Sequence, residues 1–177
     1  YFLGYEVTET HSFNVCGSFG TVISSSENRR RVLDIDLRVG DFTLDNTHSI
    51  RGGYPDLYER LSIVEIPIED NSDAIRSVLW YHTDRKYKRA IEQLTKVKTN
   101  VQVKVGEEDK SNDFSPEAPE SFFEKPAAFK VDRRLWEEKI RNYTAPFAKY
   151  GDIYEATAFF SGNNETRWYV SSEGSLI

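Results

Sequence analysis

One ten-residue stretch, "RVLDIDLRVG" at residues 31–40, constrains the fold of this chain more than any other feature. From Leu33 to Val39 apolar and polar side chains alternate strictly, with the apolar ones at Leu33, Ile35, Leu37 and Val39. Side chains on a strand have a period of two, so this pattern predicts a strand with one buried face and one solvent-exposed face. Such strands are typical of antiparallel sheets, because strands of parallel sheets are usually apolar on both faces.

Two earlier stretches carry the same period. In "YFLGYEV" at residues 1–7 the odd positions share an apolar face, and in "SFNVCGSFGTVI" we expect a second face. The residues of that second face are Phe13, Val15, Phe19 and Ile23. Between this region and the alternating stretch lie "SSSEN" and three arginines, at residues 24–31, which we interpret as the polar turn of a hairpin.

The middle of the chain predicts a short edge strand and a long helix. Pro67 in "SIVEIPI" restricts that run to an edge strand, since proline cannot donate a hydrogen bond to a sheet. The helix is predicted over residues 70–101, capped by Asn71 or Ser72, with its apolar residues at roughly helical spacing. Residues 106–130 are acidic, contain prolines and lack periodicity, which indicates a linker or a long surface loop.

A second helix is predicted from Asp132, with a kink at Pro146 and an end at Gly151. A closing hairpin follows, with its turn at Asn163 and Asn164. The sequence therefore predicts an α+β fold: a mostly antiparallel β-sheet with two main helices and β-hairpins at both ends of the chain. We expect a single domain, in which residues 131–177 complete the sheet and helix of residues 1–105 across the 106–130 linker.

Composition excludes some classes of function. The net charge is −6 and the pI about 5.2, which disfavours direct binding to nucleic acid. The cluster at Arg29, Arg30 and Arg31 is flanked by acids, so we interpret it as solvated. No apolar run is long enough for a membrane span. Cys16 is the sole cysteine, which excludes an intrachain disulfide, and we interpret it as a structural residue of a strand.

No residue pattern in the sequence indicates a catalytic or metal-binding site. The three histidines, His11, His48 and His82, lie far apart, and none belongs to a His-Glu-x-x-His pair. There is no phosphate-binding glycine loop followed by Gly-Lys-Ser/Thr, and no Gly-x-Ser-x-Gly elbow. Asp34 and Asp36 share one strand face, and we interpret them as acids that face solvent and not as a cation site or an acid/base pair. The tryptophans Trp80, Trp136 and Trp168 fall in apolar patterns that need no binding role.

Three motifs resemble the N-terminal part of proteins in the TldD/PmbA family. They are "SSSENRRRVLDIDLRVGD-x-x-LDNT", "EDN-x-x-AIR-x-x-LW" and the closing "SSEG". Members of this family are labelled modulators of DNA gyrase and understood as zinc metallopeptidases. The resemblance covers most of the chain and is weakest at residues 106–129. It marks Arg38, Asp45, Asn46 and His48 as signature or interface positions.

The resemblance implies a two-part parent protein from a bacterial source. Its C-terminal domain, beyond residue 177, would hold zinc on a His-Glu-x-x-x-His helix, hydrolyse small or unfolded peptides and pair as a homodimer or heterodimer. This chain contains no such motif. We therefore expect it to need no cofactor of its own, to be inactive alone, and to shape substrate access and subunit assembly. A peptide substrate could bind to this chain by adding as a strand to an edge of its sheet.

Other interpretations stay open at this point. A stand-alone module that binds peptides or proteins without catalysis would fit the same residues, and a DNA-linked regulator ranks last because of the acidic charge. The chain starts and ends inside strand patterns, so we expect a fragment of a longer protein. The resemblance implies a cytoplasmic parent, while an exported parent is the alternative.

Overall fold

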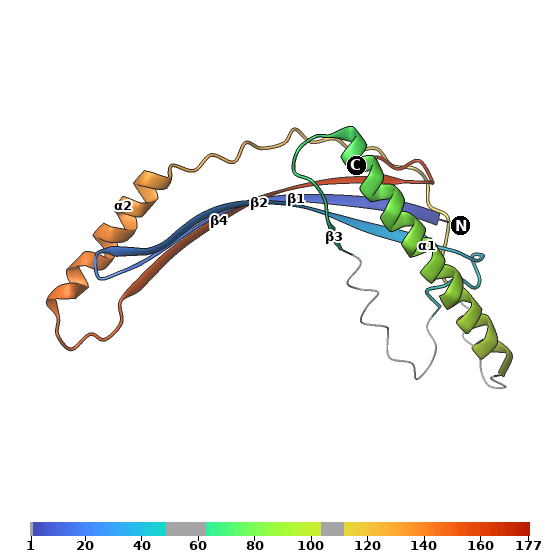
Figure 1. Cartoon of the computed structure of the whole chain (residues 1–177), viewed down its shortest axis with the longest axis horizontal. Coiled ribbons are helices and arrows are strands. Elements are labelled where there is room, and N and C mark those ends of the chain that lie inside the picture. The colour runs from blue at the N-terminus through green and yellow to red at the C-terminus, as the bar shows by residue number, and fades with distance from the viewer. Residues whose placement is uncertain (1, 49–62, 104–111) are drawn as a thin grey trace. The chain divides into compact units, whose positions relative to one another are not determined.

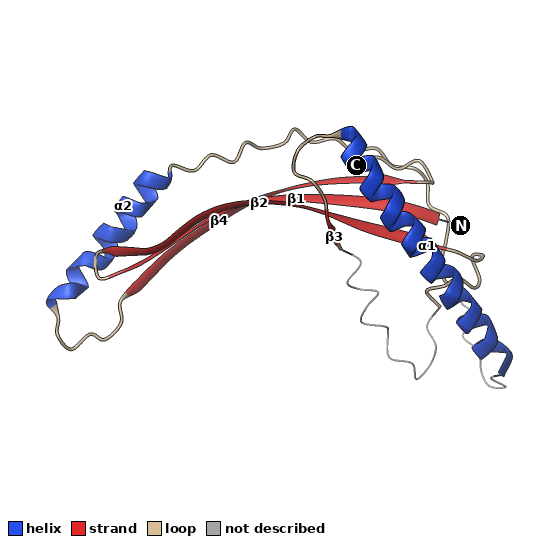
Figure 2. Cartoon of the chain, in the orientation of Figure 1, coloured by secondary structure: helices blue, strands red, loops and turns tan. Residues whose placement is uncertain are grey.

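The structure is a computed structural model that describes residues 2–48, 63–103 and 112–177. Four strands, two α-helices and a 3-10 helix lie in these ranges (Figures 1 and 2). The chain forms two compact units. Unit 1 comprises Tyr1–Thr8, Arg31–Glu124 and Arg167–Ile177, and unit 2 comprises Glu9–Arg30 and Lys125–Thr166. Each unit is therefore assembled from segments that are distant in the sequence.

Strands β1 (Phe2–Ser18) and β2 (Thr21–Arg38) form one long hairpin. Its turn consists of Phe19 and Gly20, whose φ angles are 47° and 79°. Positive φ at both central residues is what a two-residue turn needs to match the right-handed twist of its strands. The predicted turn at residues 24–31 is therefore wrong, because β2 runs through these residues without interruption.

The polar residues of that region stay in β2 because β1 supplies partners for them. Arg29 binds Glu9 with a nitrogen–oxygen distance of 2.6 Å, and His11 binds Glu27 at 2.7 Å. Cross-strand pairs of this kind stabilise an antiparallel ladder by a few tenths of a kcal/mol up to about 1 kcal/mol each. Ile23, which was expected on the apolar face, is instead exposed.

The sheet has the strand order β3-β2-β1-β4, which confirms the α+β class with a four-stranded antiparallel sheet and two main helices. Strand β3 (Val64–Glu65) is short and lies at one edge, where it pairs with Val32 and Leu33 of β2, as the proline after it indicated. Strand β4 (Thr157–Ser171) lies at the other edge.

The predicted turn at Asn163 and Asn164 is wrong, because β4 continues through both residues. Asn164 donates a hydrogen bond from its side chain to the carbonyl of Ala127 instead of closing a turn. The C-terminal hairpin exists, but it turns later: Val170 bridges Leu176 in antiparallel sense. A partner far away in the sequence thus outweighs the local turn preference of the asparagine pair.

In unit 1, helix α1 (Ser72–Val103) packs on the sheet through the side chains that the alternation predicted. Leu33, Ile35 and Leu37 are all at most 3% exposed, so each contributes roughly 1.5–3 kcal/mol of burial free energy. Asn71 caps the helix, since its side-chain oxygen accepts the backbone N–H groups of Asp73 and Ala74, as predicted.

In unit 2, helix α2 (Arg133–Thr144) begins after Asp132, close to the predicted start, and the structure shows that Asp132 caps it. The 3-10 helix η1 (Ala145–Lys149), which contains Pro146, follows it directly. The apolar side of α2 packs on Phe13 and Val15 of β1, both of which are buried. The ring of Trp136 stacks on that of Phe160 at 3.5 Å between centroids. A hydrophobic centre therefore lies between α2 and the strands of this unit.

Trp136 is the one tryptophan that packs as its apolar pattern indicated. Trp80 is 77% exposed and Trp168 43% exposed. No helix in the described parts of the chain combines the length and apolarity that crossing a bilayer needs.

Candidate functional site

The loop after β2 is built around Gly40 and the carboxylate of Asp41. A Cβ atom at Gly40 would lie 2.4 Å from the carbonyl oxygen of Leu44, and its φ is 134°, so the loop needs glycine there. One oxygen of Asp41 accepts the hydroxyl and the amide of Thr43 and the amide of Leu44. These bonds, first of all the one from the Thr43 hydroxyl, lower the pKa of Asp41 below its ordinary value. The loop is therefore tightly folded.

Asp45 and Asn46 are buried and hold this loop to the end of β2. The side-chain oxygen of Asn46 accepts the backbone N–H of Val39 at 2.6 Å, and its amide group donates to the carbonyl of Leu37. One oxygen of Asp45 accepts both the amide and the hydroxyl of Thr47, each at 2.6 Å. Both side chains thus bind backbone groups that have no partner in the sheet, so the role of both residues is structural.

Arg38 and His48 lie next to these anchors and meet Asp113, which is distant in the sequence. His48 Nδ1 lies 2.7 Å from one carboxylate oxygen of Asp113, and the other oxygen accepts the backbone N–H of Asp45. Arg38 Nη1 donates to the carbonyl of Asp113 at 3.3 Å and lies 3.4 Å from the carboxylate of Asp45. The structure therefore brings all four signature residues together within unit 1.

Asp113 is the residue of this cluster that sequence reasoning did not identify. It lies in the acidic, non-periodic stretch that we predicted as a linker, where nothing distinguishes it from its acidic neighbours. Its contact with His48 spans 65 positions of the sequence, and no local pattern reports a pairing at that distance. Only the folded chain identifies it.

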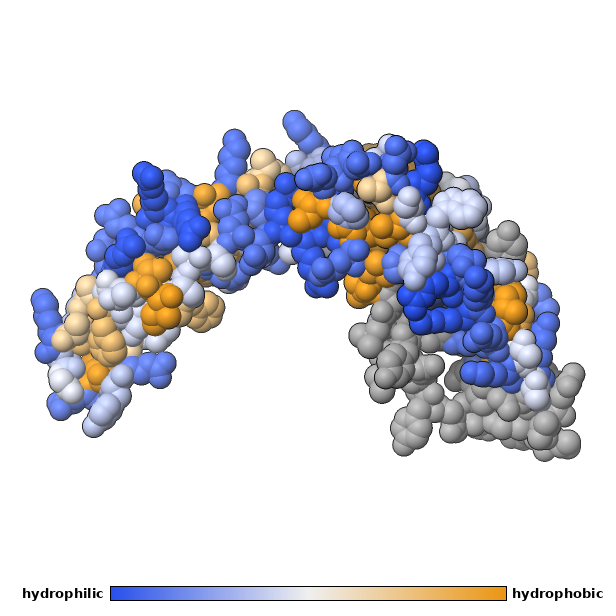
Figure 3. Space-filling view, in the orientation of Figure 1, coloured by the Kyte–Doolittle hydropathy of each residue, from blue (hydrophilic) through white to orange (hydrophobic). Residues whose placement is uncertain are grey.

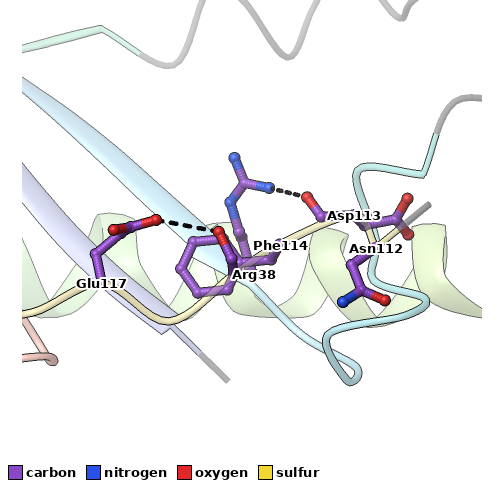
Figure 4. A pocket seen from close by; sticks show the side chains of 6 residues that line it. Arg38, Asn112, Asp113, Phe114 and Glu117 are labelled. Carbon is purple, nitrogen blue, oxygen red and sulfur yellow. Dashed lines mark hydrogen bonds between the residues drawn. The ribbon is translucent and has the colours of Figure 1, made fainter.

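A pocket of about 430 Å³ opens beside this cluster (Figure 4). Arg38 forms one wall: its guanidinium lies 5.0 Å from the ring centre of Phe114, and its buried Nε has no hydrogen-bond partner. The remaining lining residues are Asn112, Asp113, Ser115 and Glu117. Ser115 donates a hydrogen bond to Glu117 at 3.1 Å. The pocket therefore offers a cation, carboxylates and an aromatic ring to a small polar ligand.

The other histidines lie elsewhere. His11 pairs with Glu27 in unit 2, and His82 lies on α1, where burial and then the nearby positive charge of Arg85 lower its pKa below 6.5. Within the described residues, no group of three or more His, Cys, Asp or Glu side chains is arranged to hold a metal ion.

No family model matches the sequence, and no curated protein matches it. Two solved structures are similar to the whole chain. One is TldE from Thermococcus kodakarensis, with a TM-score of 0.47 and 13% identity, over 99% of this chain and 33% of that one. The other is described as a modulator of a DNA gyrase from Thermotoga maritima, with a TM-score of 0.44 and 9% identity, over 99% of this chain and 32% of that one.

The chain thus spans about a third of the length of each of these proteins. Both carry names that belong to the family whose motifs the sequence resembles. At these TM-scores and identities the similarity defines neither a site nor an activity, so the signature residues are assigned from the motifs and contacts alone.

Proposed function

We propose that this chain is the non-catalytic N-terminal domain of a zinc metallopeptidase of the TldD/PmbA type. In this role it shapes the access of small or unfolded peptides to a catalytic domain and contributes to the pairing of subunits. Zinc and the His-Glu-x-x-x-His helix belong to the catalytic domain. The sequence motifs support the family, and the surface of the chain supports the role.

The observation that carries the role is the amount of apolar surface without a partner. Among the residues that the structure describes, twelve hydrophobic residues are buried, whereas twenty large hydrophobic residues are exposed. Figure 3 shows such residues at the surface among hydrophilic ones. Single exposed apolar residues are normal, whereas several that lie together on one element are typical of a surface that docks on another protein.

Helix α1 shows this most clearly. Trp80, Tyr87 and Ile91 are 77%, 47% and 39% exposed. They are seven and four positions apart, so they form one stripe along the helix. This stripe lies beside the face that carries the buried residues Ala90 and Leu94. The helix therefore has an apolar stripe beyond the one that packs on the sheet, and we assign it to docking within the parent protein.

The test is to replace Trp80 with glutamine in the full-length protein. Because the side chain is mostly exposed, the variant should keep its thermal stability, while subunit assembly and peptide cleavage weaken together. Lys88→Gln is a matched control, since it changes an exposed residue of the same helix outside the stripe. Assembly is measured by sedimentation and cleavage with an unfolded peptide. If both stay at the level of the control, the stripe has no docking role.

A stand-alone binding module would use the same exposed surface. Sequencing the gene beyond the codon for Ile177 separates the two functions. A His-Glu-x-x-x-His motif within the next few hundred codons supports the peptidase. A nearby stop codon, or an unrelated domain, favours the binding module and contradicts the proposed function.

A further inference from the structure

The pocket beside β2 contains a charged donor that the chain itself leaves unused. Arg38 makes all its hydrogen bonds through one terminal nitrogen, Nη1, at 3.3 to 3.4 Å. The acceptors are Asp45, Thr47 and the carbonyl of Asp113. The other terminal nitrogen, Nη2, has no hydrogen-bond partner among the residues that the structure describes, and Figure 4 shows it pointing away from Asp113. Two N–H groups of the guanidinium are therefore available.

The acids near Arg38 do not occupy its guanidinium fully. The carboxylate oxygens of Asp45 and Asp36 lie 3.4 and 3.6 Å from its nitrogens. A strong guanidinium–carboxylate pair is bidentate, with nitrogen–oxygen distances of about 2.7–2.9 Å. Arg38 therefore keeps the capacity to bind an anion that enters the pocket. The exposed side-chain amide of Asn112, which bonds to no other described residue, adds a neutral donor to the same lining.

The opposite charge is supplied by Glu117. One of its carboxylate oxygens accepts the hydroxyl of Ser115 at 3.1 Å, and the other makes no hydrogen bond or ion pair within the described part of the chain. Figure 4 shows Glu117 on one side of the Arg38 side chain and Asn112 on the other. The pocket therefore presents a carboxylate on one side and donors for an anion on the other.

This arrangement selects a ligand that carries both charges. A simple anion would be attracted by Arg38 but repelled by the carboxylates of Asp113 and Glu117, which line the same pocket. A simple cation would be attracted by Glu117 and repelled by the guanidinium. A zwitterion places each charge next to the opposite one and avoids both repulsions. The pocket volume of about 430 Å³ is in the range of sites for small molecules.

We propose that this pocket binds a zwitterion of the size of a dipeptide. Its carboxylate accepts hydrogen bonds from Arg38 Nη2 and the amide of Asn112, and its ammonium group donates to Glu117. A single α-amino acid carries both charges on one carbon, whereas the donors and the carboxylate of the pocket lie on different sides of Arg38. The inference goes beyond the proposed function and does not depend on it, because it uses only groups of this chain.

The probe for the test is 5-aminopentanoate. It has as many bonds between its ammonium and carboxylate groups as a dipeptide, and it has no peptide bond that a peptidase could cleave. Binding to the full-length protein is measured by ligand-observed NMR titration and should saturate in the millimolar range, as is usual for so small a ligand. Pentanoate lacks the ammonium group and 5-aminopentanamide lacks the carboxylate. Each should bind at least about tenfold more weakly, since each loses a charged hydrogen bond.

The position of the ligand is tested by variants. Glu117→Gln should weaken the binding of 5-aminopentanoate about tenfold and leave the binding of pentanoate unchanged. Glu120→Gln is the matched control, because it removes an exposed carboxylate from the same segment outside the pocket. Both side chains are exposed, so both variants should melt at the temperature of the unmodified protein, as followed by circular dichroism.

Three results would overturn the proposal. The first is that 5-aminopentanoate shows no saturation in the millimolar range. The second is that pentanoate or 5-aminopentanamide binds as tightly as 5-aminopentanoate, which assigns the pocket to a simple anion or a simple cation. The third is that Glu117→Gln and Glu120→Gln bind the probe equally well, which places the probe elsewhere on the protein.

The proposed function and this inference fail in different ways. A full-length protein that cleaves no peptide but binds 5-aminopentanoate through Glu117 removes the proposed function alone. An active zinc peptidase that does not bind the probe removes this inference alone.

Discussion

Asn46 offers the sharpest test of how the loop after β2 is held, because its side chain replaces a missing strand partner. Its oxygen accepts the buried N–H of Val39 at 2.6 Å, and its amide group donates to the carbonyl of Leu37 at 3.3 Å. Asn46→Ala removes both bonds and leaves the Val39 N–H buried without a partner. Stranding a buried donor in this way costs about 1–3 kcal/mol.

For a chain of this length, a loss of 1 kcal/mol lowers the melting temperature by roughly 2–4 °C, so the variant should melt about 2–12 °C lower. The assay is thermal unfolding followed by circular dichroism, together with exchange of the Val39 amide, which should become faster. Asn112→Ala is the matched control, because Asn112 is exposed at the wall of the pocket. If the two variants melt together and the Val39 amide remains protected, the side chain of Asn46 does not anchor the loop.

Three further outcomes are expected. Gly17→Ala should destabilise unit 2 by about 1–3 kcal/mol in a denaturant titration, because the added Cβ would lie 2.4 Å from Ile140 Cγ2. Gly151→Ala is the control: its Cβ would meet no atom within 4 Å, so the free energy of unfolding should not change. The pKa of His82 is lowered in the folded chain, so the stability that its neutral imidazole contributes is complete above pH 6.5 and is lost as the pH falls below 6.5 through the folded pKa. In His82→Gln the melting temperature should therefore depend less on pH between about pH 7 and 5. An unchanged dependence of the melting temperature on pH contradicts this. Thr144→Val should lower the stability of unit 2 by about 1–3 kcal/mol, since the buried hydroxyl accepts a backbone N–H at 2.9 Å, while Thr144→Ser should retain most of it; equal losses would contradict the assigned bond.

Local physics allowed the sequence to predict several elements. The buried face at Leu33, Ile35 and Leu37 follows from period-two alternation, which needs no knowledge of the partner that covers it. The cap at Asn71 and the start of the second helix at Asp132 were predictable, because a cap bonds to backbone only two or three positions away. The antiparallel α+β class follows from the same local signals, since the strands come in runs.

The candidate site was predictable only in part. Arg38, Asp45, Asn46 and His48 stand within eleven positions of one another in a single motif, so the sequence marked them as a group. Their contacts were not predictable, because the partner of His48 is Asp113. Which of the four anchor the loop and which face the pocket also depends on burial, and burial is a property of the folded chain.

By itself, then, the sequence determined which residues prefer strand or helix, where the helices begin, which strand face is apolar, and the family that its motifs resemble. Tertiary structure decided where the long hairpin turns, at Phe19 and Gly20 instead of in the polar stretch at residues 24–31. It also decided that β4 runs through Asn163 and that Trp80 stays exposed. The physical reason is common to these cases: a polar residue can remain in a strand, and an apolar one can remain in solvent, according to partners that lie far away in the sequence.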